Sequence, residues 1–140
     1  ITQIANGQRT IKLGSTRPTR DFSFVSDTVA GFMAQLDSDK GIGEVINVGS
    51  GFDISIGRTA QLIAEAMGQE IEIMTEEERL RPEDSEVERL LASTDKAQEL
   101  LGWQPRYGGP DGFARGLRKT IDWFSTDDNL KLYKPDIYNI

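Results

Sequence analysis

The chain has 140 residues, enough for one domain with its own core, and its content of 37% hydrophobic and 28% charged residues is ordinary for a globular protein. The net charge of −7 argues against a nucleic-acid surface, because phosphate contacts need a basic face. The absence of cysteine excludes disulfides and thiolate chemistry, and the absence of histidine removes the Ser-His-Asp triad and the usual zinc ligands. Since no apolar run is long enough to cross a bilayer and no signal peptide opens the chain, we expect a cytoplasmic protein without a membrane partner.

The first 40 residues alternate short helix and strand patterns. Residues 1–7 read as the end of a helix closed by a glycine, and residues 10–13 and 21–25 read as short strands. A helix follows, with Ser26 or Asp27 as its N-cap. Its helically spaced apolar residues predict a stripe that packs in the core: Val29, Phe32, Met33 and Leu36.

The middle of the chain continues the alternation. Residues 44–48 are almost all apolar, which is typical of a strand covered on both faces. Ser55 is a plausible N-cap for a helix that stops at Gly68, and residues 70–74 alternate charged and apolar side chains as a half-exposed strand does. The glycine-bearing segment after residue 48 is interpreted as a plain turn, because Gly-x-Gly without a longer motif is weak evidence for a phosphate loop.

The last part of the chain is mostly helical. An acidic segment, 75–88, precedes a short helix that begins at Ser93 or Thr94 and is closed by Gly102. Pro110 suits the first turn of a final helix, which runs to Phe124. Trp103 is expected to be a packing anchor under these helices.

Strands that alternate with helices predict an α/β fold with a small sheet and several helices. No internal repeat or linker divides the chain. We therefore expect one domain over residues 1–125, followed by a loosely packed C-terminal tail over residues 126–140.

Three motifs occur in a fixed order. They are TRDFSFVSDTVAGF (19–32), GEVINVGSGFDISI (43–56) and RPEDSEVERLLASTDKAQELLGWQP (81–105). Together they resemble the C-terminal, substrate-binding part of the extended short-chain dehydrogenase/reductase superfamily, the Rossmann-type NAD-dependent nucleotide-sugar epimerases and 4,6-dehydratases. Within it, the third motif and the final residues are most similar to dehydratases of nucleotide-linked N-acetylglucosamine, of the legionaminic-acid type.

The resemblance implies a set of substrate-binding residues. They are Arg20 and Arg81 at the diphosphate, Glu86 or Asp84 at the ribose, and Ile11 and Leu13 at the nucleobase. An arginine at a strand end offers phosphate oxygens a planar fork of donors that lysine cannot match. A plainer interpretation of Arg20 is a surface salt bridge to Asp21 or Asp27, and surface pairs of this kind contribute little.

The catalytic machinery of that superfamily is not found in this sequence. Its glycine-rich turn for the dinucleotide pyrophosphate is absent. None of Tyr107, Tyr133 and Tyr138 is followed by a lysine four residues later, as the superfamily's catalytic pair requires. We therefore assign no catalytic residue, no metal and no cofactor to this chain alone, although the complete family enzymes use NAD.

Two functional hypotheses remain. In the first, the chain is the nucleotide-sugar-binding portion of an NAD-dependent 4,6-dehydratase (a lyase) or epimerase (an isomerase), inactive by itself. In the second, it is a free-standing, non-catalytic module for binding or self-association. The expected partners are a nucleotide-diphosphate sugar and either further copies of the chain or a missing N-terminal dinucleotide-binding domain. Self-association would use residues 44–48 or the helix at 56–67.

Overall fold

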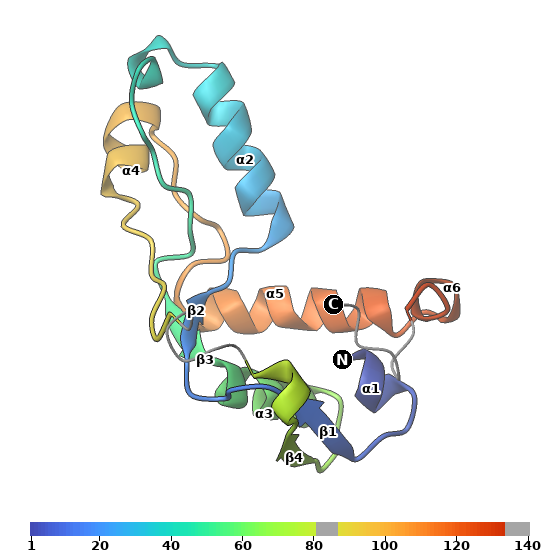
Figure 1. Cartoon of the computed structure of the whole chain (residues 1–140). Helices are drawn as coiled ribbons and strands as arrows, with labels where there is room; N and C mark the ends of the chain where they lie inside the picture. The colour runs from blue at the N-terminus through green and yellow to red at the C-terminus, as the bar shows by residue number, and fades with distance from the viewer. Residues whose placement is uncertain (81–86, 134–140) are drawn as a thin grey trace. The chain divides into compact units, whose positions relative to one another are not determined.

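The computed structural model describes residues 1–80 and 87–133, so Arg81, Asp84 and Glu86 lie outside the described residues. The described elements, in chain order, are α1 (Thr2–Ala5), β1 (Thr10–Leu13), β2 (Thr19–Asp21), α2 (Val25–Leu36), the 3₁₀ helix η1 (Asp39–Gly41), β3 (Asp53–Ser55), α3 (Ile56–Ala66), β4 (Glu72–Thr75), the 3₁₀ helix η2 (Glu77–Arg79), α4 (Asp95–Leu101), α5 (Gly109–Phe124) and α6 (Asp127–Leu130) (Figure 1). These elements form two compact units. One takes the described residues within 1–18, 55–87 and 117–140, and the other takes residues 19–54 and 88–116.

The first unit is built on a parallel pair of strands, β1 and β4, in which Ile11 lies opposite Ile73. Its core consists of Ile4, Ile11 and Ala64, with the half-buried side chains of Leu13, Ile63, Met67 and Ile71 packed around them. The other edge of β1 is met by a side chain, because the amide of Gln3 accepts from the Lys12 N–H at 3.1 Å and donates to the Lys12 carbonyl at 3.4 Å. Strand β1 therefore packs within this unit through its core residue Ile11 and bonds along its free edge to Gln3.

The second unit contains the short β2–β3 pair together with α2, η1, α4 and the start of α5. Helices α2 and α4 lie side by side, and η1 contacts both of them. Aromatic rings form the centre of packing near the strands: the Phe113 ring lies 6.0 Å from the rings of both Phe22 and Phe52, and the Phe24 ring lies 4.4 Å from that of Tyr107.

Several structural features predicted from short stretches of sequence are confirmed. The strand at 10–13 is β1, and Ser55 caps α3 by accepting from the Arg58 N–H at 3.1 Å. Gly102 ends α4 in the left-handed conformation, at φ 64°, which glycine adopts without steric cost. Trp103 is buried, as expected of a packing anchor.

The N-terminus of α2 was predicted wrongly. The strand placed at 21–25 is β2 at Thr19–Asp21, and α2 begins at Val25 with Phe24 as its N-cap and no side-chain cap. Asp27 lies inside the first turn, where its buried carboxylate accepts from the Tyr107 N–H at 2.7 Å. The carboxylate serves a residue 80 positions away instead of its own helix end.

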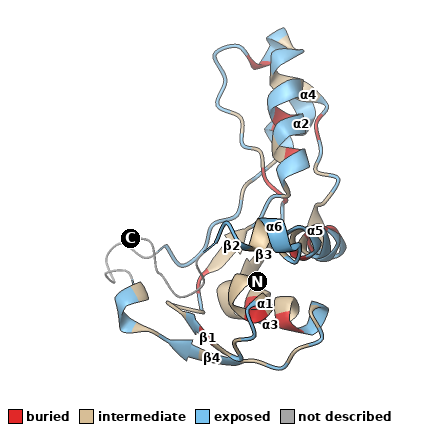
Figure 2. Cartoon of the chain, turned by 90° about the vertical axis from the view of Figure 1, so that its right-hand side faces the viewer, coloured by how far each residue is buried: buried red, intermediate tan, exposed pale blue. Residues whose placement is uncertain are grey.

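The predicted strand at 44–48 is not formed. The described chain from residue 42 to residue 52 runs without a strand assignment, and Val45 is 83% exposed. An apolar strand needs neighbours to pair with, and the described residues supply none for this segment. The apolar stripe of α2 was also expected in the core, yet it is exposed (Figure 2).

None of the helices in the described residues is both long enough and apolar enough to cross a membrane. Within the same residues, no group of acidic side chains is arranged so that it could hold a metal ion.

Candidate functional site

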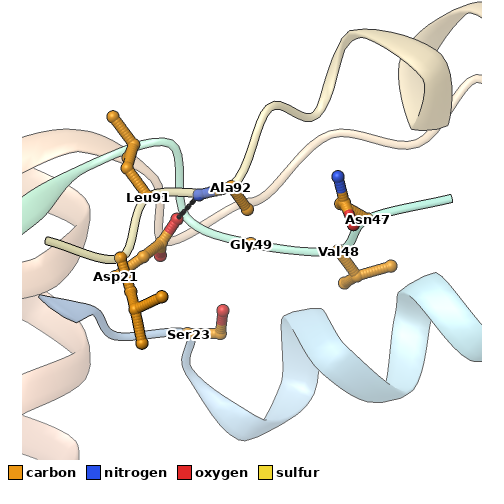
Figure 3. A pocket seen from close by; sticks show the side chains of 8 residues that line it. Asp21, Ser23, Asn47, Val48, Gly49, Leu91 and Ala92 are labelled. Atoms are coloured by element: carbon orange, nitrogen blue, oxygen red, sulfur yellow. Dashed lines mark hydrogen bonds between the residues drawn. The ribbon is translucent and has the colours of Figure 1, made fainter. Parts of the chain in front are cut away.

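The strand end that carries the Arg20–Asp21 pair is held in place by the aspartate. One oxygen of Asp21 accepts from the backbone N–H of Ser50 at 2.7 Å and from its hydroxyl at 2.5 Å. The other oxygen accepts from the N–H of Gly51 at 3.2 Å and from the N–H of Ala92 at 3.3 Å, the bond drawn in Figure 3. A single carboxylate thus ties together three segments that are far apart in the sequence.

This arrangement decides what the glycine-bearing turn at 49–51 can bind. The backbone N–H groups of Ser50 and Gly51, which a phosphate loop would point at its ligand, are both donated to Asp21. A Cβ on Gly49 would lie 2.7 Å from an oxygen of Asp21 and 2.5 Å from the Cβ of Ala92, so this glycine is needed for close packing. The turn does not fit a dinucleotide pyrophosphate, in agreement with the prediction of a plain turn.

Arg20 projects from a strand whose backbone is fixed on both sides. β2 pairs with β3 on one side. On the other side Thr19 forms a parallel bridge with Arg89, in which the Thr19 N–H donates to the Glu88 carbonyl at 2.8 Å and the Leu90 N–H donates to the Thr19 carbonyl at 3.1 Å. The half-buried side chain of Arg20 donates to the Thr19 carbonyl at 2.8 Å. An arginine in this position has a well-defined base, which favours recognition of a planar or multidentate anion.

A second arginine lies next to this strand and was missed by the sequence analysis. Arg89 makes a two-pronged contact with Asp53, with N–O distances of 2.9 and 3.0 Å. The same carboxylate accepts from the Thr19 hydroxyl at 2.7 Å. The bonds from Arg89 and then from Thr19 lower the pKa of Asp53 from 3.8 to about 2, and the carboxylate in turn raises the pKa of Arg89. No local signal reveals this pair, because its members are 36 residues apart.

Beside Asp21 lies a shallow depression of about 280 Å³ (Figure 3). Its lining residues are Asp21, Ser23, Asn47, Val48, Gly49, Leu90, Leu91 and Ala92. The size is at the lower limit for small-molecule sites, and the polar side chains are those of Ser23 and Asn47 besides the already bonded Asp21. Arg20 does not line this depression, so the depression is distinct from the diphosphate contact predicted at Arg20.

The predicted nucleobase strand lies in the first unit. Ile11 is buried in the core, so its side chain faces Ile4 and Ala64, whereas Leu13 is half-buried at the end of β1. The Leu13 carbonyl accepts from the Glu76 N–H at 2.8 Å, and a Cβ on Gly14 would collide with the backbone of Arg79. The end of β1 therefore lies against the segment that leads to Arg81, two residues further on.

The comparison with protein families identifies the chain's relatives. The model described as GDP-mannose 4,6 dehydratase matches residues 1–116. The chain belongs to this family. Curated relatives include the UDP-glucose 4-epimerase of Mycolicibacterium smegmatis, 32% identical over 118 residues, which cover 84% of this chain and 35% of that protein. Another is the UDP-N-acetyl-alpha-D-glucosaminuronate decarboxylase of Bacillus cytotoxicus, 30% identical over 131 residues, which cover 92% of this chain and 39% of that protein.

Solved structures of family members share the fold. An epimerase from Methanothermobacter thermautotrophicus is 34% identical, with a TM-score of 0.76 over 93% of this chain and 36% of that chain. The UDP-glucuronic acid 4-epimerase of Bacillus cereus, solved with UDP-glucuronic acid and NAD, is 27% identical, with a TM-score of 0.72 over 94% of this chain and 38% of that chain. The 140 residues thus span between a third and two fifths of the length of these four relatives.

Membership of the GDP-mannose 4,6 dehydratase family confirms the resemblance to extended short-chain dehydrogenases/reductases that act on nucleotide sugars, and it confirms the α/β Rossmann-type class. A relative was solved with NAD, yet the glycine-bearing turn at 49–51 of the described residues does not fit a dinucleotide pyrophosphate. The sequence has no glycine-rich motif, and the turn at 49–51 gives its N–H groups to Asp21.

Proposed function

We propose that this chain binds the nucleotide diphosphate of a nucleotide sugar and serves as the substrate-binding part of an NAD-dependent 4,6-dehydratase or epimerase, without contributing a catalytic residue. Membership of the GDP-mannose 4,6 dehydratase family supports the substrate class, since a relative in that family was solved with UDP-glucuronic acid. A part of this kind positions the sugar and leaves the hydride chemistry to the cofactor.

The observation that carries the proposal is the placement of Arg20. Its strand is fixed by β3, by the bridge to residue 89 and by the bonds of Asp21, so the guanidinium starts from a rigid base. The rigid base and the family match support the ligand role of Arg20.

The test is to titrate UDP-N-acetylglucosamine into the wild-type 140-residue chain and into its Arg20 variants. A charge-assisted contact contributes roughly 1.5–3 kcal/mol, so Arg20→Ala should raise the Kd about tenfold to a hundredfold, and Arg20→Lys should recover only part of the loss. Arg58→Ala is the matched control, because Arg58 is bonded to Glu65 on the surface of α3 and its removal changes the net charge equally. Equal Kd values for wild type and both Arg20 variants would refute the role of Arg20, and no measurable binding to the wild-type chain would refute the proposal itself.

The finer substrate class is also proposed. The third motif is most similar to dehydratases of nucleotide-linked N-acetylglucosamine, of the legionaminic-acid type, and this similarity favours an N-acetylated sugar with either a uridine or a guanosine nucleotide. The Kd values of UDP-N-acetylglucosamine and UDP-glucose, compared with each other, measure the effect of the acetamido group on affinity. The Kd values of UDP-N-acetylglucosamine and GDP-N-acetylglucosamine measure the effect of the base. Tighter binding of UDP-glucose than of either N-acetylated sugar would exclude the legionaminic-acid type.

The remaining binding residues stay predictions. Arg81 is expected at the diphosphate, and Glu86 or Asp84 at the ribose. Ile11 and Leu13 are expected at the nucleobase. The position of Leu13 beside the segment that leads to Arg81 is consistent with one nucleotide contacting both. Because Ile11 is a core residue, its contribution to the base would come from the backbone of β1.

The second hypothesis, a non-catalytic module for self-association, is favoured by a different observation. Apolar side chains of α2 are exposed, among them Phe32 at 67% and Leu36 at 79%.

A further inference from the structure

Strand β2 is short, and Arg20 is its middle residue, so the position of this arginine depends on what holds the strand at each end. Before Arg20, the parallel bridge between Thr19 and Arg89 fixes the backbone. After Arg20, the strand ends at Asp21, and residues 22–24 have neither a strand nor a helix assignment. On this side the strand is tied to the rest of its unit through the carboxylate of Asp21.

The Asp21 carboxylate is used to its full capacity. An ionised carboxylate offers about four lone-pair sites, and four donors meet them here: the N–H and the hydroxyl of Ser50, the Gly51 N–H and the Ala92 N–H. Three of these donors are backbone groups, and they lie 29, 30 and 71 residues away along the chain. Hydrogen bonds to a charged group are stronger than bonds between neutral groups, so the end of β2 is held firmly.

The turn at 49–51 is shaped to receive this carboxylate. A Cβ on Gly49 would lie 2.7 Å from an oxygen of Asp21, so a larger residue would push the two apart. Gly51 has a φ of 67°, in the left-handed region that glycine adopts without steric cost, and its N–H reaches the same carboxylate. Both glycines of the turn therefore allow the close approach of Asp21.

We propose that Asp21 is a positioning residue for the diphosphate of the nucleotide sugar: it fixes the end of β2, so that the Arg20 guanidinium is already ordered when the anion binds. The guanidinium donates to the Thr19 carbonyl at 2.8 Å, so it lies beside the backbone of the strand whose other end Asp21 holds. A donor that is ordered before binding loses less conformational entropy on binding, which raises the affinity. The role assigned to Asp21 rests on the proposed function and adds a residue that acts through Arg20.

The test is a double-mutant cycle on the 140-residue chain, in which calorimetry measures the Kd for UDP-N-acetylglucosamine. Asp21→Asn replaces one oxygen by an NH2 group, which cannot accept from the N–H donors on that side. We expect this variant to raise the Kd about threefold to tenfold in the wild-type chain, within the range of coupling between neighbouring residues. In the Arg20→Ala chain the same substitution should leave the Kd unchanged, because the residue through which Asp21 acts is gone.

Asp27→Asn is the matched control. Asp27 is buried in the same unit, and its carboxylate also accepts from a distant backbone N–H, that of Tyr107 at 2.7 Å. The same substitution at this position should lower the Tm without raising the Kd. The comparison separates the two kinds of role, because a purely structural residue changes the Tm alone.

Ser50→Ala is a milder variant, in case Asp21→Asn does not fold. It removes the hydroxyl bond to Asp21 and leaves the three backbone donors in place. We expect a smaller rise of the Kd, about twofold, which again should be absent in the Arg20→Ala chain.

A lower Tm of Asp21→Asn with the Kd of wild type would make Asp21 a structural residue and would overturn its positioning role, while the proposed function would stand. An equal rise of the Kd in the wild-type and Arg20→Ala chains would also overturn it, because Asp21 would then act without Arg20. Equal Kd values for wild type and Arg20→Ala would remove the role of both residues. No binding of UDP-N-acetylglucosamine to the wild-type chain would refute the proposed function itself, and the role of Asp21 with it.

Discussion

The pair formed by Asp53 and Arg89 makes a prediction at the scale of single residues. Because the folded chain holds the pKa of Asp53 at about 2 instead of 3.8, the ionised carboxylate stabilises the fold. This contribution is complete above the ordinary pKa of 3.8 and is lost as the pH falls through about 2. Asp53→Asn should therefore lower the urea midpoint near neutral pH, and the difference from wild type should vanish towards pH 2.

Arg89→Gln is the companion variant for this measurement. Without its guanidinium, the pKa of Asp53 should rise towards 3.8, and the loss of stability on acidification should begin at higher pH than in wild type. Urea titrations followed by circular dichroism at several pH values measure both effects. A difference between Asp53→Asn and wild type that does not change with pH would show that the pair contributes through packing alone.

At this scale the sequence predicts side-chain roles only where the partner is close along the chain. Ser55 was recognised as a helix cap because its partner, the Arg58 N–H, is three residues away. Asp21 was noticed for its place next to Arg20, but its role was not, since its partners Ser50 and Ala92 are 29 and 71 residues away. Long-range bonds depend on which segments the fold brings together, and no spacing rule encodes that.

At the scale of elements, the first turn of α5 gives a test of close packing. Gly112 is buried, and a Cβ there would lie 2.2 Å from the carbonyl carbon of Tyr107, which is backbone and cannot move aside. Gly→Ala in a helix normally stabilises by about 1 kcal/mol, but overpacking costs about 1–3 kcal/mol, so Gly112→Ala should be destabilising.

Gly116→Ala, one turn later in α5, is the graded control. At position 116 the three atoms nearest to a Cβ would all belong to the side chain of Phe24, the closest at 3.2 Å, and this side chain can shift by a few tenths of an ångström. Thermal unfolding should therefore show a clearly larger loss of Tm for Gly112→Ala than for Gly116→Ala. Equal Tm values would mean that the turn around Tyr107 relaxes freely.

The same scale shows where periodicity is informative and where it fails. The apolar spacing of residues 29–36 correctly predicted a helix, whereas the apolar run at 44–48 wrongly predicted a strand covered on both faces. Neither pattern says what covers the apolar side. In the described residues nothing covers either, so α2 is exposed and the segment at 44–48 has no strand to pair with.

At the scale of the whole molecule, the order of three motifs predicted the family, and the match over residues 1–116 confirmed it. Each motif alone is short and weakly specific. Their order and spacing together are specific to a family, because the fold requires these segments in that sequence. The prediction of one domain over residues 1–125 is not tested by this match, and the described structure groups the chain into two compact units. The allocation of residues to these units depends on long-range contacts, such as those of Asp21 and Asp27.

A titration of the 140-residue chain with NAD tests whether the chain binds the cofactor. A dinucleotide is held by backbone N–H groups at a glycine-rich turn before a helix, and this sequence has no such motif. In the glycine-bearing turn at 49–51, the N–H groups of Ser50 and Gly51 donate to the Asp21 carboxylate. Titration with NAD should therefore release no heat of binding up to millimolar NAD, whereas UDP-N-acetylglucosamine should bind. The UDP-glucuronic acid 4-epimerase of Bacillus cereus, solved with NAD, is the positive control for the same titration. A micromolar Kd for NAD would mean that residues without the glycine motif form a dinucleotide site, and the assignment of this chain to substrate binding alone would then be wrong.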